Sequence, residues 1–136
     1  HGGQILCGGS RAETGYNGHF FQPTVINYAN EQMKIAREET FGPVAPIFTF
    51  KTEEEAIKKA NNTNYGLAAY CYTKDLARAY RVMEALEYGI VGINDAIPTT
   101  AQAPFGGVKE SGMGREGGRH GIEDYLEIKF VSINIG

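Results

Sequence analysis

The chain has 136 residues and a formal net charge of −3, from 13 basic and 16 acidic side chains, and 42% of its residues are hydrophobic. Because binding to phosphates requires clustered Lys and Arg, this charge argues against a nucleic-acid-binding protein. No apolar run approaches the roughly 18 residues of a membrane-spanning helix, and the first residues do not resemble a signal peptide.

The first fifty residues contain short strand signals. Two extended segments, Gln4–Gly9 and His19–Asn27, are joined by polar residues that favour turns. Pro23 has no backbone N–H to donate, so we expect the second segment to lie at the edge of a sheet or to be irregular. Val44–Phe50 is a short apolar run that predicts another strand, although it contains Pro46.

The next part of the chain alternates between helix and strand patterns. A helix is expected from Thr52, followed by a strand at Leu67–Tyr72, a helix at Asp75–Glu87 and a strand at Ile90–Asn94. Together with the strand at Val44–Phe50, this order predicts one parallel sheet with right-handed crossover connections.

Glycine is strongly over-represented. The chain has 18 glycines, and seven of them lie in residues 106–121; average usage gives about ten in this length. The segment Gly112–Gly117 matches the GxGxxG dinucleotide pattern but lacks the buried strand that must precede it. We therefore interpret it as a loop whose backbone packs where side chains would obstruct. Gly89 follows a predicted helix and is expected to form a left-handed helix cap.

The C-terminal residues predict a short helix at about Gly121–Tyr125 and then a strand. Leu126, Ile128 and Phe130 alternate with charged residues, and this period of two predicts a half-exposed strand. Because the strand follows a long excursion from the sheet, it need not pair within its own domain.

The cysteines and histidines give little sign of chemistry. Cys7 and Cys71 form no CxxC pair, which fits reduced thiols in a cytoplasmic protein. Cys7 has no basic partner or helix start in the sequence that would activate its thiol, and Cys71 lies inside an apolar strand, so both are interpreted as structural. The three histidines lack metal-ligand spacing, and no metal site is expected.

Two polar pairs are better candidates. A carboxylate of Glu38 or Glu39 can accept hydrogen bonds from both hydroxyls of a ribose, although loop glutamates are usually only solvated. Thr99 and Thr100 follow the carboxyl end of a predicted strand, where ligands bind in open α/β sheets. Their hydroxyls can hold a carboxylate or phosphate there, or can simply cap turns.

Five segments together resemble the C-terminal part of the aldehyde dehydrogenase superfamily. They are EETFGPVAPIF, NYGLAAYCYT, YGIVGIN, APFGGVKESGMGREGG and GIEDYLEIKFV, in the family's order along nearly the whole chain. Within the superfamily, the likeness is nearest to the succinate-semialdehyde dehydrogenases. The resemblance implies an α/β fold with a parallel three-layer sheet. Residues 1–124 would be the C-terminal part of the catalytic domain, and residues 125–136 an oligomerisation strand.

The same resemblance implies oxidation of succinate semialdehyde, or a related ω-semialdehyde, to the carboxylate through a thioester, with NAD or NADP as cofactor. In the family, the nucleophilic cysteine and general-base glutamate belong to segments N-terminal to those matched here. We therefore expect a fragment that is inactive alone, and we assign no catalytic residue within it.

Family roles fall on four residues of this chain. Glu39 matches the glutamate that holds the nicotinamide ribose, and Phe41 matches a phenylalanine close to the nicotinamide. Phe105 matches an aromatic residue lining the aldehyde pocket. Thr99 matches a position where succinate-semialdehyde enzymes commonly carry a serine that binds the distal carboxylate, so the exact semialdehyde stays open.

The resemblance further implies a cytoplasmic homo-oligomer, a dimer or tetramer, with a small aldehyde as substrate and neither nucleic acid nor membrane as partner. Two alternatives stay open. One is a structural or self-association module without a catalytic role, and the other is a dehydrogenase for a different aldehyde.

Overall fold

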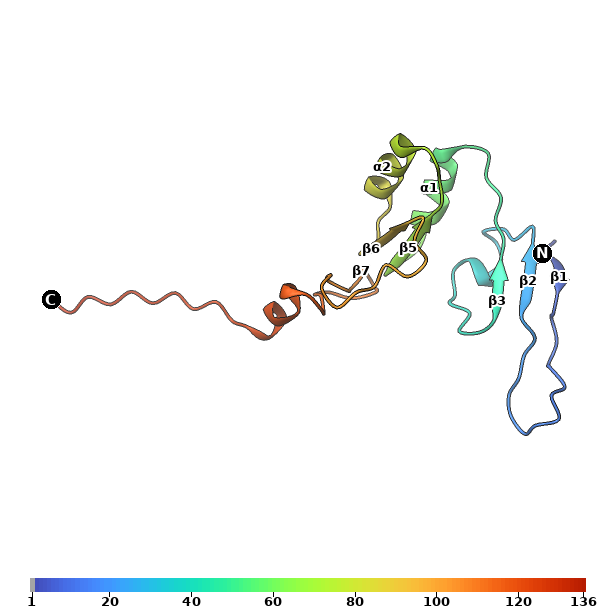
Figure 1. Cartoon of the computed structure of the whole chain (residues 1–136), viewed down its shortest axis with the longest axis horizontal. Coiled ribbons are helices and arrows are strands. Elements are labelled where there is room, and N and C mark those ends of the chain that lie inside the picture. Colours follow the sequence, from blue (N-terminus) through green and yellow to red (C-terminus); the bar gives the residue numbers. More distant parts are fainter. Residues whose placement is uncertain (1) are drawn as a thin grey trace. The chain divides into compact units, whose positions relative to one another are not determined.

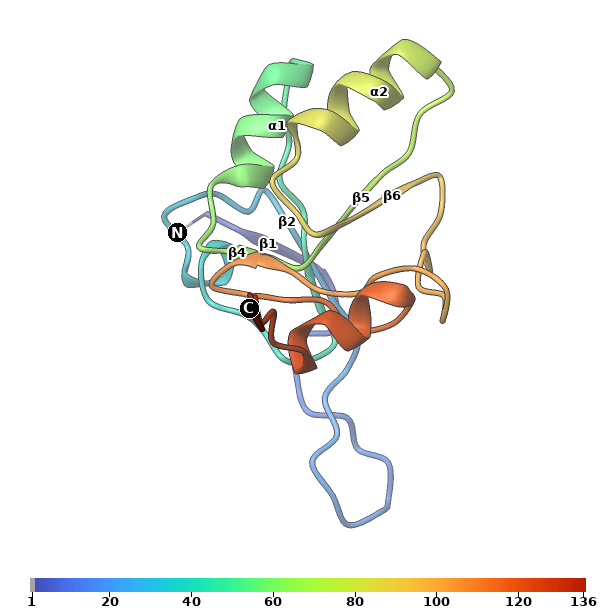
Figure 2. The ribbon, with the colours of Figure 1, turned by 90° about the vertical axis from the view of Figure 1, so that its left-hand side faces the viewer.

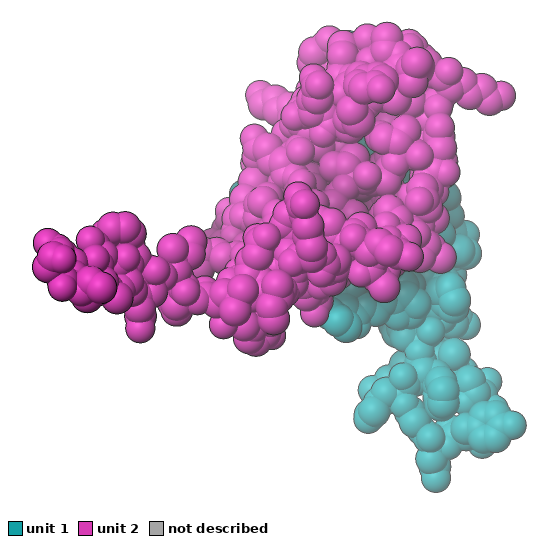
Figure 3. Space-filling model, turned by 60° about the vertical axis from the view of Figure 1, so that its left-hand side comes forward, with its two compact units in different colours: residues 1–52 teal, residues 53–136 magenta. Residues whose placement is uncertain are grey.

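The computed structural model describes residues 2–136, which form two compact units. One unit extends to Thr52 and the other begins at Glu53 (Figure 3). Within the described residues, no helix has both the length and the apolar character needed to cross a membrane.

The first unit contains a three-stranded sheet in the order β1–β2–β3 (Figure 1). Strand β1 (Gln4–Cys7) pairs antiparallel with β2 (Thr24–Asn27), and β2 pairs parallel with β3 (Val44–Pro46). A short 3-10 helix, η1 (Lys34–Ala36), lies between β2 and β3. The strands predicted in this part of the chain are therefore confirmed, although β3 ends at Pro46.

Of the two outcomes expected for the segment containing Pro23, the edge strand is wrong, since β2 is the central strand of its sheet. The irregular one is found, since only Thr24–Asn27 of this segment forms a strand and its pairing with β1 is shifted in register. Pro23 directly precedes the first residue of β2. On either side of it, Gln22 N donates to Ser10 O at 3.0 Å and Thr24 N donates to Pro43 O at 2.8 Å. The missing N–H of the proline thus falls between two hydrogen bonds and breaks neither of them.

The second unit contains two helices on the same side of a pair of parallel strands (Figures 1 and 2). The helices are α1 (Glu53–Asn61) and α2 (Leu76–Ala85), and the strands are β5 (Ala68–Cys71) and β6 (Ile90–Ile93). The strands pair in parallel from Ala68↔Ile90 to Cys71↔Ile93. The predicted strand–helix–strand unit is confirmed.

Helix α2 begins where the sequence predicts because Asp75 caps it. The Asp75 carboxylate accepts a hydrogen bond from Arg78 N at 3.1 Å, which satisfies one of the unpaired N–H groups of the first turn. The last turn of α2 ends at Ala85, before the predicted end at Glu87.

The three strands predicted to form one parallel sheet do not do so among the described strands. Strand β3 pairs with β2 in the first unit, while β5 and β6 form a two-stranded sheet in the second. Which strands pair depends on which strand edges are free to form hydrogen bonds. The apolar pattern of a strand indicates which of its faces is buried, but not which strand lies beside it.

Two further elements of the second unit bring distant segments together. Strand β4 (Tyr65–Gly66) pairs antiparallel with β7 (Val108–Lys109). Part of the glycine-rich segment therefore lies beside the residues that follow α1. A 3-10 helix, η2 (Arg119–Tyr125), matches the short helix expected there.

The expected strand at the C-terminus is not formed within the described residues. From Leu126 onward the chain has no strand partner there and runs as an extended trace (Figure 1). The side chains of Ile128 and Phe130 are 102% and 89% exposed. The period of two describes an extended backbone, but a strand also needs a neighbouring edge to hydrogen-bond to.

Candidate functional site

In the first unit, Glu39 and Phe41 lie on a loop that is anchored at both ends. Before them, Arg37 N donates to Lys34 O at 2.9 Å; after them, Pro43 O accepts from Thr24 N at 2.8 Å. Both side chains are exposed, and Phe41 is 95% exposed. The Glu39 carboxylate makes no hydrogen bond or ion pair with the residues that the structure describes. This loop therefore exposes a carboxylate and an aromatic ring to solvent.

In the second unit, Thr99 lies on the loop that leaves the carboxyl end of β6, as predicted, and its side chain is exposed. Asn94 directs the start of this loop. Its backbone is left-handed, with φ 55°, and its side-chain amide donates to Thr73 O and accepts from Thr73 N, both at 2.8 Å. The β5–β6 pairing is thus extended by a side chain instead of by a further strand residue.

Phe105 is half-buried and lies where the chain folds back on itself. Its backbone forms two antiparallel hydrogen bonds with Glu116, at 2.7 and 2.8 Å. The loop closed by these bonds contains most of the glycine-rich segment. Inside it, the guanidinium of Arg115 donates to the carbonyls of Gly107 and Gly114, at 2.8 and 2.6 Å. The position of Phe105 is therefore set by backbone contacts.

Most glycines of this segment are closely packed, as expected from the sequence, although a Cβ atom on Gly112 would meet no other atom within 4 Å. A Cβ atom on Gly114, which has φ 78°, would collide with the Asp124 carboxylate. Gly89 has no left-handed backbone, so the helix cap expected there is wrong. A Cβ atom on Gly89 would instead collide with Gly106 O, so this glycine is required for contact between two segments.

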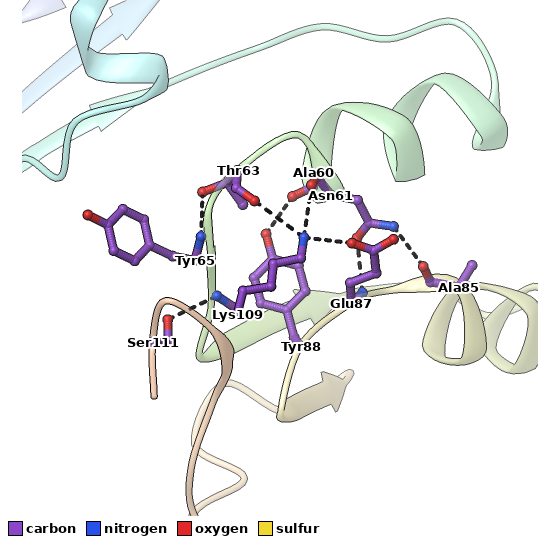
Figure 4. Close-up of polar contacts among 10 residues, drawn as sticks. Ala60, Asn61, Thr63, Tyr65, Ala85, Glu87, Tyr88, Lys109 and Ser111 are labelled. Carbon is purple, nitrogen blue, oxygen red and sulfur yellow. Dashed lines mark hydrogen bonds and ion pairs between the residues drawn. The ribbon is translucent and has the colours of Figure 1, made fainter. Parts of the chain in front are cut away.

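A polar cluster ties the ends of α1 and α2 to β7 (Figure 4). The Asn61 side chain donates to Ala85 O at 2.8 Å and accepts from Glu87 N at 3.0 Å. The Lys109 ammonium donates to Asn61 O at 3.0 Å and forms an ion pair with Glu87 at 2.6 Å. The Tyr88 hydroxyl donates to the carbonyl oxygen of Ala60. Burial raises the pKa of the Tyr88 phenol; Lys109 acts against this rise and Glu87 adds to it, so the hydroxyl keeps its proton at neutral pH.

A second charged group joins the two helices at their N-terminal ends. The Glu53 carboxylate accepts from Arg81 Nε and Nη2, at 2.7 and 2.8 Å, and from Arg78 Nε at 3.0 Å. The hydrogen bonds from Arg81 are the largest cause that lowers the Glu53 pKa, from 4.5 to about 2. Glu53 is therefore ionised throughout the neutral range.

The described residues contain no group of three or more His, Cys, Asp or Glu side chains that can hold a metal ion. Cys7 is exposed in β1, where its thiol contacts only the Pro23 carbonyl, at 3.9 Å, and Cys71 is half-buried in β5.

Residues 1–131 match the model of the aldehyde dehydrogenase family. The chain belongs to this family. It is 55% identical to the NADP(+) succinate-semialdehyde dehydrogenase of Escherichia coli strain K12 and 54% identical to the 3-sulfolactaldehyde dehydrogenase of Pseudomonas putida. These alignments cover 98% and 97% of the chain but 27% of each relative. The chain thus spans about a quarter of the length of the curated relatives it matches.

Solved structures of the family share the fold over most of the chain. The succinate-semialdehyde dehydrogenase of Burkholderia pseudomallei aligns with a TM-score of 0.86 and 53% identity, over 91% of this chain and 25% of that one. The betaine aldehyde dehydrogenase of Staphylococcus aureus in complex with NAD+ aligns with a TM-score of 0.88 and 48% identity, over 93% of this chain and 25% of that one. The resemblance to the family inferred from the sequence is confirmed.

The four predicted site residues thus occupy two loops. Glu39 and Phe41 lie on one loop of the first unit. Thr99 and Phe105 lie on the segment that follows β6 in the second unit. Sequence reasoning missed Asn94 and the cluster around Lys109. Asn94 had a readable signal, since Asn tolerates left-handed backbone at a strand end, whereas the partners of Lys109 lie far away in the sequence.

Proposed function

We propose that the protein is an NAD(P)-dependent dehydrogenase of an aldehyde that carries a second, acidic group, with succinate semialdehyde as the first choice. The family match over residues 1–131 carries the proposal. Relatives at 51–55% identity are named for succinate semialdehyde, glutarate semialdehyde and 3-sulfolactaldehyde, all of which are anionic aldehydes. A betaine aldehyde dehydrogenase at 48% identity acts on a cation, so identity alone does not decide the substrate.

Glu39 and Phe41 would contribute to the cofactor site. The Glu39 carboxylate would accept hydrogen bonds from the hydroxyls of the nicotinamide ribose, and the Phe41 ring would lie against the nicotinamide. Support comes from the exposure of both side chains on one anchored loop. When bound, NAD or NADP supplies the acceptor for the hydride that leaves the aldehyde.

Thr99 and Phe105 would contribute to the aldehyde site. The Thr99 hydroxyl would donate a hydrogen bond to the distal carboxylate of the substrate, a bond between a neutral donor and an ionised acceptor. The Phe105 ring would form an apolar wall beside the aldehyde. The exposure of Thr99 and the fixed backbone of Phe105 support these roles.

Residues 125–136 would add a strand to a sheet of a second copy of the protein. The extended backbone and the exposed apolar side chains of this segment support that role. Residues 1–124 would then be the part of the chain that belongs to the catalytic domain.

The substrate proposal is tested by steady-state kinetics of the full-length protein with NAD and with NADP. We expect a kcat/KM at least about tenfold higher for succinate or glutarate semialdehyde than for propanal or betaine aldehyde, since a hydrogen bond to an ionised group contributes about 1.5–3 kcal/mol. Equal values for all four aldehydes would exclude the proposed substrate class.

Substitution of Thr99 tests the same proposal at a single residue. Thr99→Val keeps the shape of the side chain and removes the hydroxyl, so the KM for succinate semialdehyde should rise about tenfold. The KM for propanal should not change, and Thr99→Ser should behave like the wild type. An equal rise for both aldehydes would show that Thr99 acts on the fold instead of the carboxylate.

A further inference from the structure

Lys109 has a backbone conformation that its residue type disfavours. Its φ is 56°, in the left-handed region where a Cβ atom approaches the following carbonyl. It stands in a segment rich in glycine, and Gly112 and Gly114 nearby have positive φ values at no such cost. A lysine here must therefore contribute an interaction that a glycine would lose.

The side chain of Lys109 makes that interaction (Figure 4). Its ammonium donates to Asn61 O at 3.0 Å and to Thr63 O at 3.3 Å, and it pairs with the Glu87 carboxylate at 2.6 Å. An ammonium has three N–H donors, and three acceptors surround this one. One acceptor, Asn61 O, is the carbonyl of the last residue of α1, where the helix dipole favours a cation, and Thr63 lies two residues beyond the helix.

The contacts of Lys109 continue into the segment that leads to Phe105. Tyr65↔Lys109 and Gly66↔Val108 form the β4–β7 ladder, and Glu110 N donates to Asn64 O at 2.9 Å. On the other side, Gly106 O packs against Gly89, two residues after the Glu87 that pairs with Lys109. Residues 106–110 are thus held by α1, by β4 and by the segment that follows α2.

We propose that Lys109 is a positioning residue for the aldehyde pocket. Its ammonium fixes β7 to the end of α1 and to Glu87, and this anchor sets the path of residues 106–109 and so the place of Phe105. The role assigned to Phe105 rests on the proposed function. Lys109 touches neither substrate nor cofactor and acts through the backbone.

Lys109→Gly distinguishes the contribution of the ammonium from that of backbone strain. The substitution removes the side chain and also makes the left-handed backbone favourable, so any loss of protection comes from the missing ammonium. Lys109→Arg keeps a cation, and Glu87→Gln removes only its counter-charge. Lys74→Gly serves as the control, since Lys74 is an exposed lysine in a turn without an ion pair among the described residues.

The first readout is amide hydrogen exchange of residues 64–66 and 105–111 in the full-length protein, which does not depend on activity. Lys109→Gly should speed exchange there about tenfold and Glu87→Gln by a smaller factor. Lys109→Arg should retain most of the wild-type protection from exchange, and Lys74→Gly should leave that protection unchanged. Unchanged or slower exchange in Lys109→Gly would overturn the proposal.

The second readout is kinetic. In Lys109→Gly the KM for the aldehyde should rise about fivefold or more, while the KM for the cofactor and kcat should stay within about twofold. An equal rise of both KM values, or faster exchange with an unchanged aldehyde KM, would overturn the positioning role. A wild-type protein without aldehyde oxidation would instead contradict the proposed function, and the exchange experiment would still decide whether Lys109 anchors β7.

Discussion

At the carboxyl end of β6, the side chain of Asn94 takes the place of one more pair of strand residues. It makes two hydrogen bonds with the backbone of Thr73 while its own backbone is left-handed. Because the loop to Thr99 starts here, the direction of that loop depends on one amide group.

Replacement of Asn94 by alanine should therefore loosen the loop. It removes two hydrogen bonds and leaves the Cβ atom in left-handed backbone without the amide group that compensates for it, which together should lower the free energy of local opening by about 2–4 kcal/mol. Asn94→Asp keeps the acceptor for Thr73 N and should lose about half as much. Hydrogen exchange of the backbone amides of residues 73 and 94 measures the loss of opening free energy in each variant. Equal protection in the wild type and the alanine variant would contradict the role of the side chain.

At the scale of elements, α1 and α2 are joined at both ends. Asn61 and Lys109 act at the C-terminal end of α1, and Glu53 pairs with two arginines of α2 at the other end. The ion pairs are partly exposed to solvent, so their effect should depend on salt and on pH.

The pairing of α1 with α2 should weaken in acid. Because the Glu53 pKa is lowered in the folded protein from 4.5 to about 2, its contribution is complete above pH 4.5 and is lost as the pH falls towards 2. In the full-length protein, the difference in melting temperature between the wild type and Glu53→Gln should therefore shrink below pH 4.5, and also in high salt. Glu84→Gln makes the same change of charge on α2 without an ion pair in the described part of the chain and is the control. A constant difference from pH 7 to 3 would refute this assignment.

The elements also show which features the sequence could predict. Helix α2 and the parallel pairing of β5 with β6 followed from local signals, namely the helical spacing of apolar residues and the strand–helix–strand order. The central place of β2, the pairing of β3 and the β4–β7 ladder depend on partners far away in the sequence. Gly89 was recognised as special for the wrong reason, because its neighbour Gly106 is invisible in a local pattern.

Prediction of the candidate site from local sequence patterns was limited in a similar way. Glu39 and Thr99 were already candidates from their residue type and position, but their roles, and the choice of Phe41 and Phe105, were predicted only through resemblance to a family. Lys109 could not be predicted in this way, because its role follows from a backbone angle and from a carbonyl of α1 that only the folded chain brings near.

At the scale of the whole molecule, the chain leaves most of its apolar surface uncovered. Among the described residues, Ala29 and Val82 are the only buried hydrophobic side chains, and none of the large side chains is fully buried. Phe41, Ile128 and Phe130 are each at least 89% exposed. Since burial of apolar surface is the main favourable contribution to folding, these 136 residues provide little of the core that a stable domain needs.

The 136-residue chain produced by itself should therefore neither fold cooperatively nor oxidise an aldehyde. We expect a broad thermal transition by circular dichroism, strong binding of a dye that reports exposed apolar surface, and self-association in size-exclusion chromatography. With succinate semialdehyde and NAD or NADP, it should form no reduced cofactor, because the resemblance to the family assigns the nucleophilic role to neither Cys7 nor Cys71. The full-length protein under the same conditions is the control and should melt sharply. A sharp melting transition of the isolated chain would show that its core suffices, and formation of reduced cofactor would show that it contains a nucleophile.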